Sequence, residues 1–231
     1  SVLLQGKNVL YITCEMAEEK IAERIDANLL NVNIKEISEL PKSTFYKKVQ
    51  NLSNKTTGKL IIKEYPTGSA HAGHFRSLLS ELHLKKSFKP DIIFIDYLNI
   101  CASSRYRSAV NVNSYNYIKS IAEELRGLAV EYDVPIFSAT QTTRSGFASS
   151  DPNLTDTSES FGLPATADLM FALVSSEELE TLGQVMVKQL KNRYNDPTFT
   201  AQDDILDKGD DDQYNYEQSE TSKAKFSEFK F

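Results

Sequence analysis

One short stretch decides the fold class of this chain, Ile92-Ile93-Phe94-Ile95-Asp96-Tyr97. Four consecutive apolar residues closed by an acid are typical of a parallel strand that is buried on both faces. An acid at the carboxyl end of such a strand points into the crevice where open α/β sheets bind their ligands. We therefore predict a strand over Asp91–Asp96 at the centre of an α/β sheet, with a ligand site beside Asp96.

Strand-like and helix-like segments alternate on both sides of this stretch, as in a mostly parallel sheet flanked by helices. The other strands are expected at Asn8–Thr13, Leu60–Lys63, Pro135–Thr140, Leu169–Val174 and Gln184–Leu190. Helices are expected at Met16–Leu30, around Phe75–Leu82 and at Ser114–Tyr132, where apolar residues recur at helical spacing. Residues 142–165 form a long polar loop in this interpretation, and Thr198–Ile205 with Gln213–Glu217 form an antiparallel hairpin.

Composition excludes several classes of protein. The 231 residues are 40% hydrophobic and 25% charged, as in a globular protein with a real core. No apolar run approaches the roughly 20 residues that a membrane span needs, so no membrane association is expected. Two cysteines, Cys14 and Cys101, stand in apolar contexts and are expected to be small buried residues beside the sheet edge. A reduced, cytoplasmic setting follows.

The net charge of −6 is unevenly distributed. Residues 203–231 hold nine acidic residues against four lysines, whereas the rest of the chain carries 22 basic and 23 acidic side chains. The acidic pI therefore does not exclude a nucleic-acid partner for the main body.

Two acids are candidates for phosphate chemistry. Asp96 could hold Mg²⁺ at the sheet edge, as in nucleoside triphosphatases, or it could cap the next segment. Glu15 follows the first strand and could act as a general base on an attacking water, but taken alone it is explained more simply as a favourable charge at a helix N-terminus.

Polar residues also follow two later strands. Gln141 ends the strand Pro135–Thr140, where an amide can sense a terminal phosphate, although it could be an ordinary loop residue. Lys188, Lys191 and Arg193 cluster at the end of Gln184–Leu190 and could contact phosphate, or form the solvated end of an edge strand.

A nucleic-acid interface is suggested more weakly. Arg105 and Arg107 flank Tyr106, and Phe161 lies in the polar loop, so that guanidinium and aromatic groups could meet a nucleic-acid backbone and its bases.

The chain contains no phosphate-loop motif of the form G-x-x-x-x-G-K-[ST]. Ser1–Gly6 look like the end of a helix capped by Gly6, and a strand follows at once. We expect that a strand, a phosphate loop and most of a helix are missing at the N-terminal side.

Five motifs, in this order and spacing, resemble the motor domain of DnaB-type replicative helicases, with the T-even bacteriophage members nearest in look. They are Ile12-Thr13-Cys14-Glu15-Met16, Ile95-Asp96-Tyr97-Leu98-Asn99, Ser138-Ala139-Thr140-Gln141-Thr142-Thr143-Arg144, Asp156-Thr157-Ser158-Glu159-Ser160 and Lys188-Gln189-Leu190-Lys191-Asn192-Arg193. The resemblance covers residues 1–217 as a partial RecA-like domain, and residues 218–231 are expected to be a disordered tail.

The resemblance implies a hexameric ring that hydrolyses ATP between subunits with Mg²⁺ and moves along single-stranded DNA. Glu15 matches the glutamate that activates water, Asp96 the Mg²⁺-coordinating acid and, with Tyr97, part of the nucleotide site. Gln141 matches the residue that couples the γ-phosphate to the DNA loops. Arg193 looks like the finger that reaches the neighbour's nucleotide, with Lys191 beside it.

The resemblance also places two DNA-facing segments, Ala102–Asn113 and Asp156–Pro164. Their candidate DNA-binding residues are Arg105, Arg107, Ser158, Glu159, Ser160, Phe161 and Gly162. Ser158 and Phe161 depart from the residues that cellular members often carry, namely Arg and Gly. A primase, a helicase loader and the host-cell cytoplasm are the implied partners and location.

Three hypotheses remain open. The chain is the carboxyl part of an ATP-driven helicase motor and inactive when isolated; it is a non-catalytic RecA-like module for oligomerisation or DNA binding; or it belongs to another RecA-like class such as a recombinase. The Glu15-Met16 pair and the spacing from Lys188 to Arg193 argue against the third.

Overall fold

The structure is a computed structural model, and it describes the chain except for residues 38, 107–111, 143–152, 155–161, 195–203 and 208–231. Its centre is a four-stranded sheet of β1 (Val9–Thr13), β2 (Leu60–Glu64), β3 (Ile92–Asp96) and β4 (Ile136–Ser138). The strand order is β2-β1-β3-β4, and every pair is parallel. The four strands predicted for this part of the chain are confirmed, and β3 lies inside the sheet as expected.

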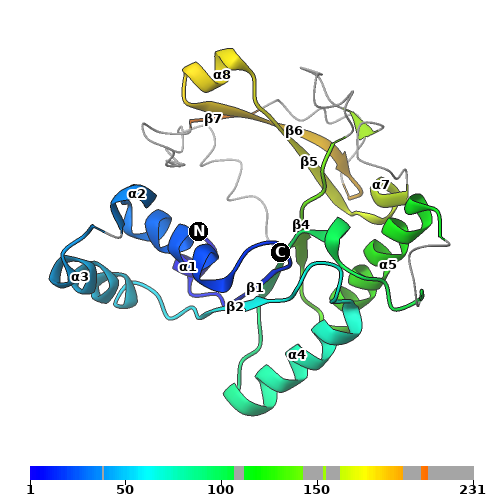
Figure 1. Cartoon of the computed structure of the whole chain (residues 1–231), viewed down its shortest axis with the longest axis horizontal. Coiled ribbons are helices and arrows are strands. Elements are labelled where there is room, and N and C mark those ends of the chain that lie inside the picture. The colour runs from blue at the N-terminus through cyan, green and yellow to red at the C-terminus, as the bar shows by residue number, and fades with distance from the viewer. Residues whose placement is uncertain (38, 107–111, 143–152, 155–161, 195–203, 208–231) are drawn as a thin grey trace.

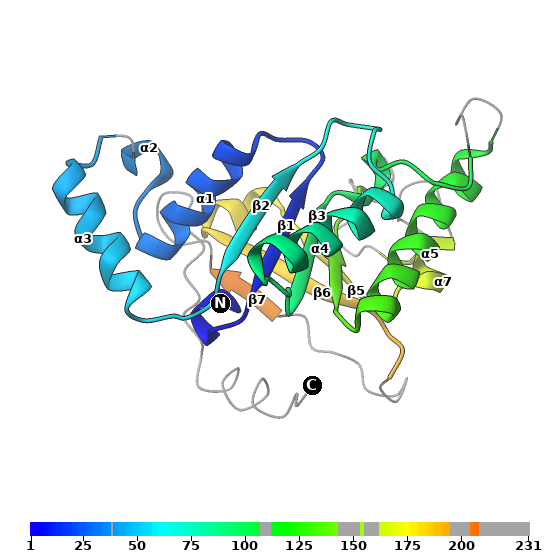
Figure 2. The ribbon, with the colours of Figure 1, turned by 90° about the horizontal axis from the view of Figure 1, so that it is seen from below.

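Helices α4 (Ala72–Lys86) and α5 (Ser114–Tyr132) cover one face of this sheet. Figure 2 shows both helices in front of the sheet, with the second sheet behind it. Alternate residues of β1 and β3 point into this layer because side chains alternate along a strand. They form the main core with both helices, and the members with almost no exposure are Leu10, Ile12, Ile93, Ile95, Phe75, Ile121 and Leu128.

Three further helices follow β1, namely α1 (Glu18–Leu30), α2 (Ile34–Ile37) and α3 (Lys42–Ser53). Helix α1 begins two residues later than predicted, and the residue that caps its C-terminal end, Asn31, has a left-handed φ of 50°. Helices α2 and α3 were not predicted. Neither contains a buried residue among those described.

The face of the parallel sheet opposite α4 and α5 carries a row of aromatic rings. Tyr11 on β1 stacks on Phe94 on β3 with ring centroids 6.1 Å apart, and Phe94 lies 5.5 Å from Phe137 on β4. Strand β4 is the edge of the sheet, and the Phe137 side chain is 47% exposed. This row therefore ends on an open side of the structure.

A second sheet of β5 (Leu169–Val174), β6 (Gln184–Asn192) and β7 (Asp204–Asp207) is antiparallel. It lies across the parallel sheet from α4 (Figure 1). The two predicted strands are confirmed and pair antiparallel, and the link between them forms α8 (Glu177–Thr181). Strand β7 overlaps the end of the predicted strand Thr198–Ile205 and pairs with β6. Gln213–Glu217 lie outside the described residues, so the hairpin stays a prediction.

Three short elements complete the fold. Leu3–Gln5 form the 3-10 helix η1, and Gly6 ends it with a φ of 82°, as the sequence predicts for a glycine cap. Leu98–Ile100 form a second one, η2. Helix α7 (Gly162–Thr166) lies in the predicted polar loop, where Leu163 joins the core. In the part of the chain that is described, no helix has the length and apolarity to cross a membrane.

Candidate functional site

The parallel sheet brings three of the predicted residues to one edge. Thr13 at the end of β1 pairs with Asp96 at the end of β3, and Ile95 pairs with Ser138 at the end of β4. Glu15 comes two residues after β1 and Gln141 three residues after β4. Because the strands are parallel, their carboxyl ends meet at the ligand-binding edge of the sheet.

Asp96 is half-buried and held from the neighbouring strand. The Tyr11 hydroxyl donates a hydrogen bond of 2.9 Å to Oδ2 of Asp96, and the Cys14 N–H donates one of 2.7 Å to the Asp96 carbonyl. Burial, together with the neighbouring carboxylate of Asp96, raises the pKa of Tyr11 well above its usual value. Tyr11 therefore stays a donor, and it fixes the orientation of the Asp96 carboxylate.

Glu15 lies in a tight turn between β1 and α1, and its side chain is exposed. The Thr13 hydroxyl closes this turn because it donates to the Met16 carbonyl at 2.8 Å and accepts from the Met16 N–H at 3.0 Å. The Thr67 hydroxyl also donates to the Cys14 carbonyl at 2.7 Å. Helix α1 starts at Glu18, so Glu15 lies three residues before the first helical residue.

Gln141 contacts the segment that follows β3. Its side-chain N–H donates to the Tyr97 hydroxyl at 3.2 Å. The Leu98 N–H donates to the Ala139 carbonyl at 3.3 Å, which ties the same two segments through the backbone. A displacement of Gln141 would therefore reach the residue next to Asp96.

Oxygen atoms dominate the side chains at this edge. Among the described residues, the Thr140 hydroxyl oxygen is buried without a hydrogen-bond partner, and it stands next to Gln141. No cluster of three His, Cys, Asp or Glu residues with metal-binding geometry occurs in the described part of the chain. Mg²⁺ prefers oxygen ligands and commonly uses one or two carboxylates together with water and phosphate oxygens. The donors at the edge therefore fit a Mg²⁺ ion that is held partly by a nucleotide.

The two cysteines lie together behind this edge, as expected. Cys14 and Cys101 are 2% and 3% exposed, and their sulfur atoms are 3.9 Å apart. Their hydrogen-bonding contact raises the pKa of Cys101 and lowers that of Cys14, and burial adds to the rise at Cys101. Both are packing residues of the core that supports the edge.

Lys191 and Arg193 lie at the far end of β6 and contact α7 in the same chain. Lys191 Nζ donates to the Pro164 carbonyl at 2.5 Å, and an Arg193 guanidinium N–H donates to the Ala165 carbonyl at 2.6 Å. Burial, followed by the charge of Arg193, lowers the pKa of Lys191. The structure thus places both side chains against α7, with Lys191 half-buried and Arg193 exposed.

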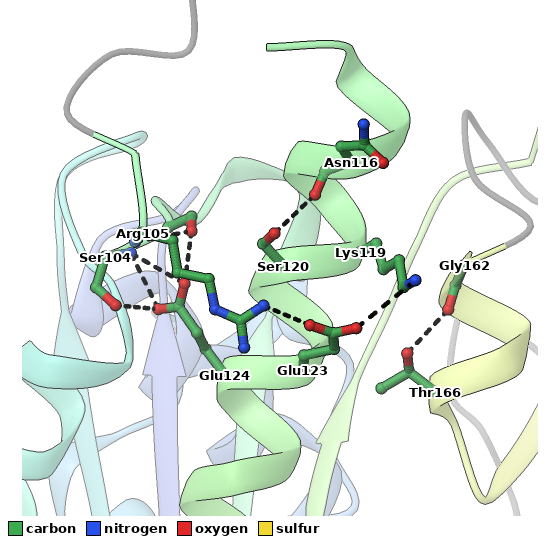
Figure 3. A network of polar contacts seen from close by, with 10 residues as sticks. Ser104, Arg105, Asn116, Lys119, Ser120, Glu123, Glu124, Gly162 and Thr166 are labelled. Carbon is green, nitrogen blue, oxygen red and sulfur yellow. Dashed lines mark hydrogen bonds and ion pairs between the residues drawn. The ribbon is translucent and has the colours of Figure 1, made fainter.

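The candidate DNA-binding residues are only partly described. Arg105 forms an ion pair with Glu123 on α5, and the Ser104 N–H and hydroxyl bind Glu124 (Figure 3). Arg107, Ser158, Glu159, Ser160 and Phe161 lie outside the described residues. Gly162 is buried at the start of α7, where an added Cβ would lie 2.8 Å from carbon atoms of Lys119. Its DNA contact remains a prediction.

Three residues of this region were missed from the sequence, namely Tyr11, Arg126 and Asp168. Arg126 Nη1 lies 2.6 Å from Oδ1 of Asp168, and Arg193 Nη1 lies 3.1 Å from the same oxygen. Their sequence context gave little signal: Tyr11 lies inside a strand, Arg126 is one of several charged residues of α5, and Asp168 directly precedes β5.

The parallel sheet flanked by helices, followed by the antiparallel strands, is a RecA-like α/β fold. The family model for the DnaB-like helicase C terminal domain matches residues 1–198, and the chain belongs to this family.

Two relatives with similar sequences are named as replicative helicases. A DnaB-like replicative helicase of Enterobacteria phage T4 is 50% identical over 194 residues, which are 83% of this chain and 41% of that protein. A probable plasmid replicative DNA helicase of Chlamydia psittaci is 29% identical over 201 residues, 84% of this chain and 42% of that protein. The chain thus spans about two fifths of these relatives.

Solved structures agree on the fold. A DnaB-like replicative helicase, described with its interactions with primase, superposes with a TM-score of 0.71 at 19% identity, over 90% of this chain and 50% of that one. A second solved structure, described as an ATPase domain, superposes with a TM-score of 0.66 at 20% identity, over 87% of this chain and 70% of that one.

Proposed function

We propose that this chain is part of the ATP-dependent motor domain of a replicative, hexameric DNA helicase, which moves along single-stranded DNA and unwinds duplex at the replication fork. One observation carries the proposal. Asp96 ends β3, and Glu15 lies two residues beyond the end of the neighbouring strand β1. Family membership and the phage T4 relative support it.

Each residue at the edge has a distinct task in this proposal. Asp96, oriented by Tyr11, holds Mg²⁺ directly or through water, with Tyr97 lining the nucleotide site. Glu15 accepts a proton from the attacking water, and its exposed carboxylate is free to reach a ligand. The bound Mg²⁺ supplies charge stabilisation for the phosphate oxygens. Gln141 senses the terminal phosphate and passes its position to the segment after β3 through Tyr97.

Arg193 and Lys191 act on the neighbouring subunit's nucleotide. Their place at the end of β6, outside the parallel sheet, suits a group that reaches across a subunit boundary. The single-stranded DNA contacts are assigned to Arg105, Arg107 and the segment from Ser158 to Gly162. A primase and a helicase loader are proposed as further partners, and the host-cell cytoplasm as the location.

We further propose that the chain is only part of the motor, extending over residues 1–217 with a tail at 218–231, and that the phosphate loop is supplied by a preceding segment. The position of β4 supports this, because it is the outer strand of the parallel sheet in the part of the chain that the structure describes. Phe137 on β4 is 47% exposed. A strand added beside β4 would cover part of this side chain, and would bring a phosphate loop to the edge that carries Asp96.

The test compares ATP hydrolysis by the isolated chain and by the same chain joined to a phosphate-loop segment, each with single-stranded DNA. We expect turnover only in the joined chain, and a loss of about 10²- to 10⁴-fold with Glu15→Gln. Glu19→Gln is the matched control, because Glu19 is an exposed glutamate on α1.

Two results would contradict the proposal. Robust turnover by the isolated chain that Glu15→Ala abolishes would refute the partial-motor assignment. Absence of hydrolysis in a folded joined chain that still oligomerises or binds DNA would favour the non-catalytic module instead.

A further inference from the structure

The carboxylate of Asp168 is the shared acceptor of two arginines from different elements. Its Oδ1 atom lies 2.6 Å from Nη1 of Arg126 on α5 and 3.1 Å from Nη1 of Arg193 after β6. The Asp168 carbonyl also accepts a hydrogen bond of 2.8 Å from the Arg193 N–H. Asp168 therefore holds Arg193 through both its side chain and its backbone.

The same cations satisfy the carbonyl groups at the C-terminal end of α7. Arg126 donates to the Thr166 carbonyl at 2.8 Å, and Arg193 donates to the Ala165 carbonyl at 2.6 Å. Lys191 donates to the Pro164 carbonyl at 2.5 Å. The last carbonyls of a helix have no partner within the helix, so these contacts fix its end.

The charges around Asp168 are unbalanced. Three cations, Arg126, Lys191 and Arg193, converge on a region where Asp168 supplies the anion that pairs with both arginines. Burial and the charge of Arg193 lower the pKa of Lys191, whereas Asp168 acts in the opposite direction. Removal of the Asp168 charge would leave the guanidinium groups of Arg126 and Arg193 repelling each other.

We propose that Asp168 is a positioning residue that sets where the Arg193 guanidinium lies and links it to α5 and α7. This inference rests on the proposed function, in which Arg193 reaches the neighbour's nucleotide. In the sequence, α5 follows one of the two segments assigned to DNA, and α7 begins within the other. One carboxylate thus connects the nucleotide-facing arginine to the helices behind both DNA segments.

A purely stabilising role predicts a different outcome. The side chains of Arg126, Asp168 and Arg193 are 36%, 35% and 36% exposed, and ion pairs of this exposure add little to folding stability. Loss of Asp168 should therefore change the position and reactivity of Arg193 much more than it changes unfolding of the chain.

The first experiment measures modification of single arginines by phenylglyoxal in the folded chain, resolved by peptide mass spectrometry. We expect Asp168→Asn to increase the modification rate of Arg193 about three- to fivefold, the factor that corresponds to a partly exposed ion pair. Arg76 is the internal control, since it pairs with Glu131 elsewhere and should keep its rate. Glu131→Gln is the matched variant and should affect Arg76 alone.

A second variant keeps the test decisive if Asp168→Asn does not fold. Arg126→Gln leaves Asp168 with Arg193 as its remaining arginine partner, so the Arg193 rate should fall or stay the same. An Arg193 rate unchanged by Asp168→Asn, or increased by Arg126→Gln, would overturn the inference.

The joined chain gives a second readout. Asp168→Asn is expected to lower kcat for DNA-stimulated ATP hydrolysis about tenfold or more while KM stays within about twofold, because the arginine acts on the transition state. Unchanged kcat in Asp168→Asn would count against the positioning role. If the wild-type joined chain has no activity, the proposed function fails, whereas the arginine modification still decides the anchoring of Arg193.

Discussion

Tyr11 and Asp96 are joined across the strand pair β1 and β3 by a hydrogen bond of 2.9 Å from the tyrosine hydroxyl to Oδ2. Tyr11 pairs with Phe94 in the parallel register, so Asp96 is its neighbour two residues further along the adjacent strand. The two side chains share the sheet face that is opposite α4 and α5. The acid at the proposed metal site is thus oriented by a residue deep in the sheet.

The raised pKa of Tyr11 predicts a loss of stability at alkaline pH. Burial, then Asp96, favours the neutral phenol in the folded chain, so this contribution is fully present below the usual tyrosine pKa of about 10 and is lost as pH rises above it. Tyr11→Phe should therefore reduce the fall in stability between about pH 9 and pH 11, measured by urea unfolding. Tyr46→Phe is the control because Tyr46 is 68% exposed, and an equal effect of both variants would contradict the prediction.

The lowered pKa of Glu124 predicts a loss of folding stability at acid pH. Burial raises its pKa, but hydrogen bonds from Ser103, Ser104 and the Arg105 N–H outweigh burial and lower it overall. The stability it provides is present above the unfolded pKa of about 4.3 and is lost as pH falls through the folded value. Glu124→Gln should cost about 1–3 kcal/mol of unfolding free energy at pH 7.

Urea titrations of wild type and Glu124→Gln at about pH 7 and pH 3 test this. The difference in unfolding free energy between wild type and Glu124→Gln should be smaller at the lower pH. Glu131→Gln is the exposed control and should show little change at either pH. A gap that widens on acidification would disprove the assignment.

The α4 layer should dominate the stability of the fold. Phe75 is fully buried, and Phe75→Ala is expected to cost about 3–5 kcal/mol of unfolding free energy because it removes apolar contacts and leaves a cavity. Phe137→Ala should cost less than about 1.5 kcal/mol, since its ring is half-exposed and mainly contacts Phe94. Chemical denaturation of both variants gives the comparison, and equal costs would show that the core is elsewhere.

The cysteines should be unreactive in the native chain. Cys14 and Cys101 are almost fully buried, and a thiol must be exposed as thiolate to attack a disulfide reagent. We expect negligible release of thionitrobenzoate from Ellman's reagent at about pH 8, and two equivalents after unfolding in urea. Rapid stoichiometric reaction without denaturant would show that the sheet edge opens readily.

DNA binding by the isolated chain should be weak and strongly salt-dependent. Binding should be weak because a single chain lacks the avidity of a ring. Its affinity should fall as the salt concentration rises, because contacts to DNA phosphates release bound counterions. Fluorescence anisotropy with labelled single-stranded DNA at about 50 and 200 mM salt measures this. Tight binding that is insensitive to salt would contradict the prediction.

The parallel sheet was predictable because its signals are local. The run Ile92–Ile95 with Asp96, and the apolar stripe of α5, depend on side-chain period alone, and both elements lie where expected. Helix α7 was not predictable in this way. It begins in a polar stretch that shows no helical period. Its first three residues, Gly162, Leu163 and Pro164, have low helix propensity as a set and are buried in the folded chain.

The candidate site was predictable as a set of residues but not as a set of contacts. Glu15, Asp96 and Gln141 each end or follow a strand, so the topology alone places them at one edge. The pairs Tyr11 with Asp96 and Arg126 with Asp168 join residues 85 and 42 positions apart, and each depends on register or on the docking of α7. These contacts follow from tertiary packing, which no local pattern encodes.

The open edge of β4 also affects how the isolated chain behaves in solution. Among the described strands, β4 is paired on one side only, and such an edge is a template for self-association. The exposed apolar side chains of Phe137 on β4, and of Phe171 and Leu173 on β5, favour association as well. The purified chain should therefore aggregate as its concentration rises. A lysine in place of Leu173, which is 73% exposed, would act as a gatekeeper and keep the chain monomeric.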